Sequence, residues 1–62
     1  MEIDHEKSIA YAKVYLKTDE QKKFNVYYCG WNPWLEEHEW VDMPGDYYLE
    51  HEFEFVEIKY NE

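Results

Sequence analysis

The sequence has 62 residues, with fifteen acidic side chains against six basic ones, all lysine, and a formal net charge of −9. This length predicts one domain, 1–62, with a small core of its own. Aromatic residues make up 21% of the chain, which argues against intrinsic disorder. The negative charge and the lack of arginine argue against direct binding to DNA, RNA or anionic lipid.

Cys29 is the only cysteine, so the chain cannot form an internal disulfide. No apolar run approaches the roughly 18 residues that cross a membrane. The acidic start, MEIDHEKS, does not resemble a secretion or organelle-targeting leader. We therefore expect a cytoplasmic protein whose cysteine is a small buried hydrophobe.

The first half of the chain predicts a β-hairpin. Residues 1–7 are polar, and we expect a frayed end. Residues 8–17 alternate with period 2 and read as a strand, although the Ala, Lys and Leu content also suits a helix. Residues 18–23 read as a polar connection and residues 24–29 as a second strand, which Gly30 ends. The side chains expected on the core face are Ala10, Ala12, Val14 and Leu16 from the first strand and Phe24, Val26 and Tyr28 from the second.

The stretch from 31 to 46 is the least regular part of the sequence. Asn32 and Pro33 suit the N-cap and first position of a helix, which predicts one short helix around 33–39. The alternative is a wide loop leading into a short strand over 39–43. Met-Pro-Gly-Asp at 43–46 predicts a type II turn within a longer connection.

Residues 46–60 predict the last strand. Leu49, His51, Phe53 and Phe55 share one face, and His51 there suggests a partly buried ring with a hydrogen-bond partner. The alternation shifts after Phe55. This shift predicts either a β-bulge near 55–56, or a strand end covered on both faces. The bulge would return three further side chains to the core: Val56, Ile58 and Tyr60.

Together these elements predict a mainly β (or small α+β) fold. We expect a single three- to four-stranded antiparallel meander sheet with at most one short helix around 33–39. Ser8 is the only serine, there is no phosphate-binding glycine loop, and the histidines and acids match no recognised metal-ligand spacing. We therefore expect no enzyme activity, no cofactor and no metal site.

The negative charge is confined to the second half. Residues 1–33 hold five acids and five lysines, whereas residues 34–62 hold ten acids and one lysine. Glu50, Glu52 and Glu54 share one strand face and would repeat at roughly 6.6–6.8 Å. Alternate phosphates of a DNA strand have a similar axial spacing, so this glutamate row predicts a DNA-mimic surface. The alternative reading is a solvated sheet face.

The composition of the whole chain is similar to that of phage-encoded inhibitors of host enzymes, DNA mimics among them. We expect a non-enzymatic inhibitor whose acidic half docks on a basic, nucleic-acid-binding surface of a host protein in the host cytoplasm. The alternative is a homodimer, or a structural or accessory module, that uses an aromatic sheet face. The expected partner-binding side chains are acids and aromatic anchors: Glu36, Glu37, Glu39, Asp42, Asp46, Glu50, Glu52, Glu54, Glu57, Trp31, Trp34, Trp40, Tyr47 and Tyr48.

Overall fold

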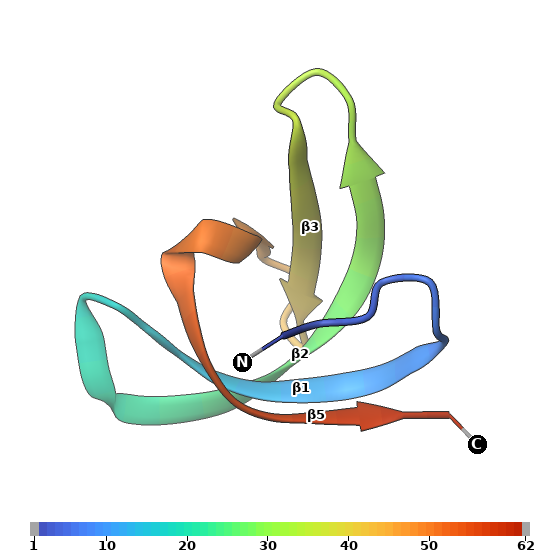
Figure 1. The fold of residues 1–62 in the computed structure, drawn as a ribbon. Helices are drawn as coiled ribbons and strands as arrows, with labels where there is room; N and C mark the ends of the chain where they lie inside the picture. Colours follow the sequence, from blue (N-terminus) through green and yellow to red (C-terminus); the bar gives the residue numbers. More distant parts are fainter. Residues whose placement is uncertain (1, 62) are drawn as a thin grey trace.

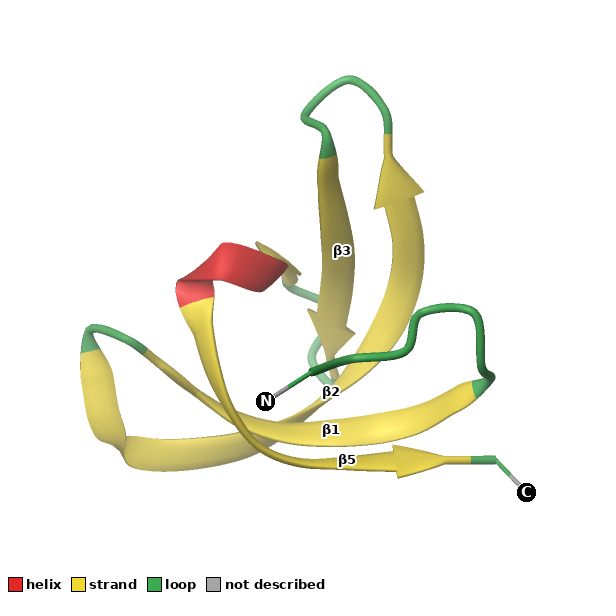
Figure 2. Cartoon of the chain, in the orientation of Figure 1, coloured by secondary structure: helices red, strands yellow, loops and turns green. Residues whose placement is uncertain are grey.

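The computed structural model describes residues 2–61, which form one antiparallel sheet of five strands in the order β4-β3-β2-β1-β5. The mainly β prediction is confirmed, with one strand more than expected. The first four strands form a meander, and the last returns to pair with the first (Figures 1 and 2). The elements are β1 (Ile9–Leu16), β2 (Asp19–Asn32), β3 (Glu37–Asp42), β4 (Tyr47–Leu49), the 3-10 turn η1 (Glu50–Glu52) and β5 (Phe53–Tyr60).

The long strand β2 shapes the molecule because its two halves pair with different neighbours. Its first part pairs with β1 and its second part with β3, and the two meet at Val26. Figure 1 shows β1 and β5 running across the β2–β3 hairpin. The polar connection expected over 18–23 is shorter than predicted, because β2 already begins at Asp19. Gly30 does not end the strand; it lies within β2 beside a register shift, with a φ of 131° that favours glycine.

The core lies on the concave side of the bent sheet. Ala12 and Val14 of β1, Val26 of β2, Trp40 of β3 and Phe53 of β5 are buried. Ala12, Val14 and Val26 confirm most of the core faces predicted for the first two strands. Ala10 does not join the core, and Ile9 packs against it instead, where the β1–β5 register shifts between Ile9 and Tyr11. Further side chains from β1, β2, β4, β5 and the N-terminal segment pack against this cluster: Ile3, Ile9, Leu16, Phe24, Tyr28, Tyr48, Phe55 and Ile58.

The short helix predicted around 33–39 is wrong, and the loop-and-strand alternative holds. The Asn32 Oδ1 atom accepts hydrogen bonds from the Trp34 and Leu35 N–H groups, at 2.9 and 3.2 Å, much as an N-cap would. Glu36 then takes a left-handed φ of 53°, which turns the chain back into β3 instead of continuing a helix. The capping chemistry is the expected one, but it serves a hairpin turn.

The single last strand predicted over 46–60 is also wrong. It divides into β4, η1 and β5, and β4 and β5 occupy opposite edges of the sheet. One continuous strand could not pair with both β3 and β1, so the chain must turn between them. The Glu52 carboxylate accepts the Leu49 N–H at 2.7 Å and thereby stabilises that turn.

The predicted β-bulge near 55–56 is confirmed. Val14 pairs with Phe55 and the preceding Lys13 with Glu57, which leaves Val56 as the extra residue. Val56 itself is 40% exposed, so its predicted return to the core is wrong. Ile58, by contrast, packs against the core, since the bulge restores the inward parity after Glu57.

A frayed end is expected over residues 1–7; residue 1 lies outside the described residues, and the N-terminal segment, residues 2–8, contacts the sheet. It crosses the sheet, as Figure 1 shows, and Ile3 packs against the core. The Asp4 N–H donates to the Tyr60 hydroxyl at 3.1 Å, and the Asn61 N–H donates to the Ser8 carbonyl at 2.8 Å. Contacts with the far end of the chain therefore hold the segment in place.

Cys29 is exposed, contrary to the buried position expected for it. It precedes Gly30, where the register of β2 against β3 shifts, and its side chain lies outside the core. Partial desolvation, and secondarily the nearby Glu39 carboxylate, raise the pKa of the Cys29 thiol. A raised thiol pKa disfavours the reactive thiolate.

Candidate functional site

Four carboxylates converge on one cavity of about 450 Å³, which we call the acidic pocket. Glu36 and Glu37 come from the β2–β3 hairpin, Glu50 from η1 and Glu54 from β5. Lys17 is the one lysine among the lining residues. The pocket therefore carries a strongly negative charge, which favours a cationic ligand.

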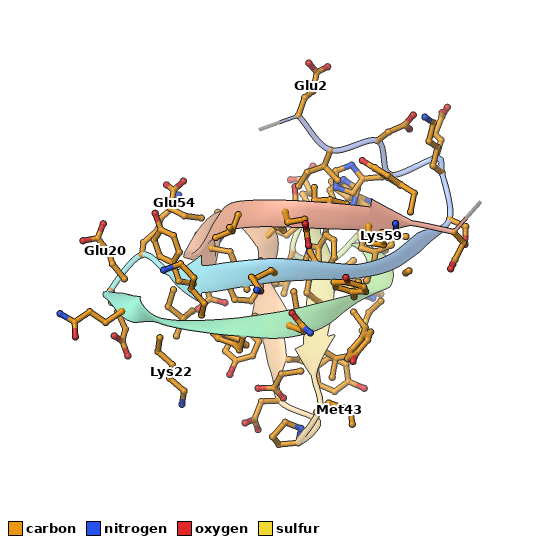
Figure 3. All side chains as sticks on the ribbon, turned by 90° about the horizontal axis from the view of Figure 1, so that it is seen from below. Glu2, Glu20, Lys22, Met43, Glu54 and Lys59 are labelled. Atoms are coloured by element: carbon orange, nitrogen blue, oxygen red, sulfur yellow. The ribbon has the colours of Figure 1, made fainter. Side chains whose placement is uncertain are left out.

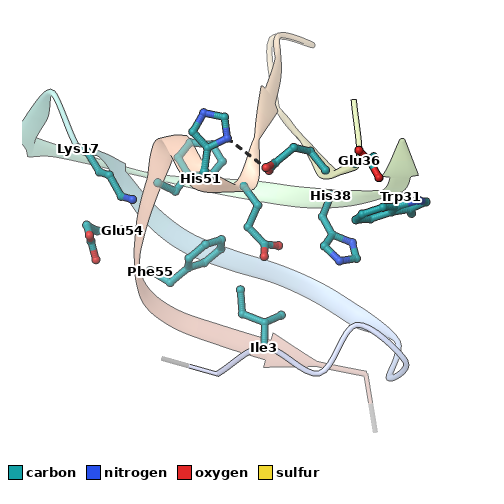
Figure 4. Close-up of a pocket in the computed structure, with 11 residues that line it drawn as sticks. Ile3, Lys17, Trp31, Glu36, His38, His51, Glu54 and Phe55 are labelled. Carbon is teal, nitrogen blue, oxygen red and sulfur yellow. Dashed lines mark ion pairs between the residues drawn. The ribbon is translucent and has the colours of Figure 1, made fainter. Parts of the chain in front are cut away.

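The rest of the pocket wall is aromatic and apolar. Trp31, His38, Phe53 and Phe55 line it, together with Ile3 of the N-terminal segment. In Figure 4, Glu54 and Lys17 lie at one end and His38 and Trp31 at the other, with Phe55 between them. Aromatic faces beside carboxylates suit lysine or arginine side chains, because a ring attracts a cation over its face.

Glu50 connects the acidic pocket to the core. Its Oε1 atom accepts a hydrogen bond from Trp40 Nε1 at 3.0 Å and lies 2.7 Å from His5 Nε2. The Glu50 and His5 side chains are both partly buried, each 23% exposed. Desolvation, and secondarily the Glu50 charge, raise the pKa of the neighbouring Tyr28 hydroxyl. Glu50 therefore holds three elements together in addition to its contribution to the pocket's charge.

All three histidines lie at or beside the acidic pocket. The rings of His5 and His38 are stacked, with centroids 3.6 Å apart and planes inclined by 5°. Tyr28 contacts His38 Nδ1 through its hydroxyl at 2.7 Å. His51 is exposed, contrary to the partly buried ring expected, and its Nδ1 lies 3.3 Å from Glu37 Oε1.

Three apolar side chains project from the β2–β3 hairpin next to the pocket, and we call them the hairpin tip. Trp31 is 53%, Trp34 92% and Leu35 55% exposed. The two hydrogen bonds to Asn32 Oδ1 fix the backbone that presents Trp34 and Leu35. Exposed tryptophan on a fixed turn is typical of a binding anchor, since little conformational entropy is lost when it docks.

The prediction that Glu50, Glu52 and Glu54 form an evenly spaced row on one strand face is wrong. Glu50 and Glu52 belong to the turn η1, and their carboxylates bond to Trp40 and to the Leu49 backbone respectively. Glu54 alone of the three lies on β5. A 3-10 turn does not repeat side chains at the strand interval, so the DNA-like spacing is lost.

The other acids predicted for the surface do not join the pocket. Glu39 lies opposite Leu49 in the β3–β4 ladder, and Glu57 lies opposite Lys13 of β1. Asp42 and Asp46 lie at the turn between β3 and β4. Glu57 shares β5 with Lys59, which Figure 3 labels on that strand, so β5 carries both signs of charge.

The predicted aromatic anchors also divide by position. Trp40 is fully buried in the core, so its side chain is not accessible to a partner in this structure. Trp31 and Trp34 form the hairpin tip, and Tyr47 is exposed on β4. Tyr48 donates a hydrogen bond to Asp42 Oδ2 at 3.0 Å, and this bond is the first cause of the raised pKa of its hydroxyl.

Asp42 organises the turn between β3 and β4. Its Oδ1 atom accepts from the Gly45 and Asp46 N–H groups, at 3.0 and 2.8 Å, and its Oδ2 accepts from Tyr48. Desolvation alone would raise the pKa of Asp42, but the hydrogen bonds from Asp46, Tyr48 and Gly45 together lower it below its usual range. This turn supports a structural role for Asp42.

The lowered pKa predicts acid sensitivity at this turn. A carboxyl group that binds its proton less tightly when folded stabilises the fold above its unfolded pKa, near 3.8, and that contribution is lost as the pH falls through the lower folded pKa. We expect Asp42→Asn to remove this part of the pH dependence in urea unfolding measured between about pH 6 and pH 2. Asp46→Asn, whose carboxylate takes no part in these bonds, is the control. Equal pH profiles for the two variants would contradict the assignment.

The structure also brings together residues that the sequence did not single out. Ile3, His5 and Lys17 reach the pocket region from segments distant in sequence from Glu50. The tryptophans within residues 31–40 predict an aromatic anchor there, but they do not predict that a hairpin turn presents it. No local pattern identifies the His5–His38 stack, because 32 residues separate the two rings along the chain.

A second cavity, of about 450 Å³, lies near the β3–β4 turn. Its apolar wall includes Phe24, Tyr27, Met43 and Pro44. Asp19, Asp42 and Lys22 also line it, so acids do not predominate as strongly as in the acidic pocket. Asp42 is already committed to the turn. The acidic pocket is therefore the stronger candidate site.

Comparison with known proteins found no matching family model, no matching curated protein and no matching solved structure. Within residues 2–61, no group of three or more His, Cys, Asp or Glu side chains is arranged to hold a metal ion. No helix in this part of the chain is long and apolar enough to cross a membrane. The function must therefore be argued from the pocket and the hairpin tip alone.

Proposed function

We propose that this protein is a non-enzymatic binding protein that docks its acidic pocket and hairpin tip on a basic, nucleic-acid-binding surface of a partner protein. The observation that carries the proposal is the convergence of Glu36, Glu37, Glu50 and Glu54 on one pocket beside exposed tryptophans. The carboxylates would steer a basic partner over long range, and Trp31 and Trp34 would supply short-range contacts.

The proposal retains competition with nucleic acid but changes its geometric basis. A partner's lysine or arginine, ordinarily paired with phosphate, would enter the acidic pocket between carboxylates and aromatic faces. Competition of this kind does not require regular phosphate-like spacing, which η1 removes from the glutamate row. In this proposal the chain acts as an inhibitor of a host nucleic-acid-binding protein, in the host cytoplasm if it is phage-encoded.

The test is capture of proteins from host lysate on the immobilised full chain at low salt, repeated with excess heparin or DNA. The proposal predicts a nucleic-acid-binding partner that is released by added salt and by either polyanion, since both compete for the same basic surface. Capture that neither salt nor polyanion weakens would contradict it.

A homo-oligomeric module is the second candidate, because apolar side chains are exposed at both ends of β3. Trp34 projects at one end, and Met43 and Tyr47 at the other. The charge of −9 opposes self-association, so a dimer should be favoured by high salt, which screens that repulsion. A light-scattering mass that rises with protein concentration at high salt would support this candidate over the first.

A further inference from the structure

We infer that the stacked His5–His38 pair is a pH-sensitive latch that holds residues 2–5 against the acidic pocket and releases them when both rings are protonated. The inference concerns regulation of the acidic pocket and takes its functional meaning from the proposed function.

The latch joins three elements at one point. His5 stacks on His38 of β3 with ring centroids 3.6 Å apart, contacts Glu50 of η1 at 2.7 Å, and lies tilted against the ring of Tyr28. Ile3, two residues earlier, lines the acidic pocket. Holding His5 in place therefore holds Ile3 in the pocket wall.

The observed contacts are compatible with a histidine pair that carries one positive charge. A charged His5 ring would form an ion pair with Glu50, and a neutral His38 would keep its hydrogen bond with Tyr28. The stack is retained, because a single positive charge has a carboxylate partner at 2.7 Å.

A second proton changes the balance. Two positive rings would then face each other at 3.6 Å, and their repulsion falls as the rings separate. Tyr28 of β2 and Glu50 of η1 contact the pair. Glu37 and Glu39 adjoin His38 along β3, and Asp4 and Glu6 adjoin His5 in the N-terminal segment. Lys17, Glu36, Glu37, His51 and Glu54 line the pocket beyond. Among these, Glu50 is the carboxylate bonded to a ring of the pair, so one of the two charges lacks a bonded counter-ion.

Separation of the rings has a defined consequence for the pocket. Apart from the His5 contacts, residues 2–5 are held by the packing of Ile3 against the core and by the Asp4 N–H bond to the Tyr60 hydroxyl. Release would withdraw Ile3 from the pocket wall and free the Glu50 Oε1 atom from His5. Acidification would thereby open the acidic pocket to a larger basic side chain or segment.

The test is NMR spectroscopy of the full chain without any partner, titrated from about pH 8 to about pH 5, the range in which histidine changes charge. We expect the amide signals of Ile3 and Asp4 to shift together with the ring signals of His5 and His38. The Asp4 amide should also lose hydrogen-exchange protection. The amides of Val14 and Val26, in the core, should not move and report that the fold is intact.

Two variants separate the latch from general acid effects. His38→Gln cannot gain the second charge, so Ile3 and Asp4 should stay in place down to about pH 5. His51→Gln removes an exposed histidine outside the stack and should leave the wild-type transition unchanged. If the Val14 and Val26 signals show that His38→Gln does not fold, His5→Gln takes its place. This variant also cannot carry two charged rings, so its Ile3 and Asp4 signals should not change between about pH 8 and about pH 5.

Absence of any shift at Ile3 and Asp4 in the wild type would overturn the inference, as would the same shift in the His38→Gln protein. Because the experiment uses the isolated chain, its failure would not touch partner binding. Equally, failure of the salt and polyanion test would leave the latch result as a property of the free protein.

Discussion

Trp40→Ala is expected to leave the chain largely unfolded at room temperature. Trp40 is fully buried, packs against Tyr28 and Phe55, and donates its indole N–H to Glu50. Truncating a buried tryptophan costs about 3–5 kcal/mol, which is comparable with the ~3–5 kcal/mol that a core in a domain of this size supplies. Far-UV circular dichroism and urea unfolding would measure the loss.

The chain supplies its own control in Trp34→Ala. Trp34 is 92% exposed, so the same substitution there should change the free energy of unfolding by no more than about 0.5 kcal/mol. The comparison separates the core tryptophan from the hairpin-tip tryptophan with one chemical change. Similar stabilities for the two variants would show that the core is not organised around Trp40.

Glu50→Ala is expected to have the second largest effect, lowering the free energy of unfolding by about 1–3 kcal/mol. The substitution leaves the Trp40 indole N–H without its acceptor inside the core and removes the partner of His5. Urea unfolding at neutral pH would measure the change. Glu50→Gln, which keeps an acceptor oxygen, should retain part of the lost stability.

Glu54→Ala is the matched control, because it removes the same charge from the same pocket. Glu54 is exposed on β5, so its loss should change stability by about 0.5 kcal/mol or less. If Glu50→Ala were no more damaging than Glu54→Ala, the role of Glu50 in joining pocket and core would be refuted.

The strand faces could be predicted because they depend on local alternation. Ala12 and Val14 were placed on the core face by parity alone, and the parity shift after Phe55 located the bulge. The same rule failed over residues 49–53. There the alternation continues, but the chain must pass from the β3 edge to the β1 edge, and tertiary pairing overrides the local pattern.

The candidate site was less predictable because its geometry comes from long-range contacts. The sequence concentrated acids and tryptophans in the second half, and Glu36, Glu37 and Glu54 do line one pocket. Nothing local showed that Glu50 would bond to Trp40, or that residues near the N-terminus would reach it. The capping role predicted for Asn32 is correct, because its side chain accepts the Trp34 N–H. Pairing of β2 with β3 makes the capped segment a hairpin turn instead of a helix.

The association rate with the captured partner at low salt tests whether the acidic pocket is the docking site. We compare the triple variant Glu36→Gln, Glu37→Gln, Glu54→Gln with Glu6→Gln, Glu20→Gln, Glu57→Gln, which removes the same charge from side chains outside the pocket. We expect the association rate to fall about tenfold or more for the pocket triple variant and much less for the other. Equal association rates for the two triple variants would contradict this expectation.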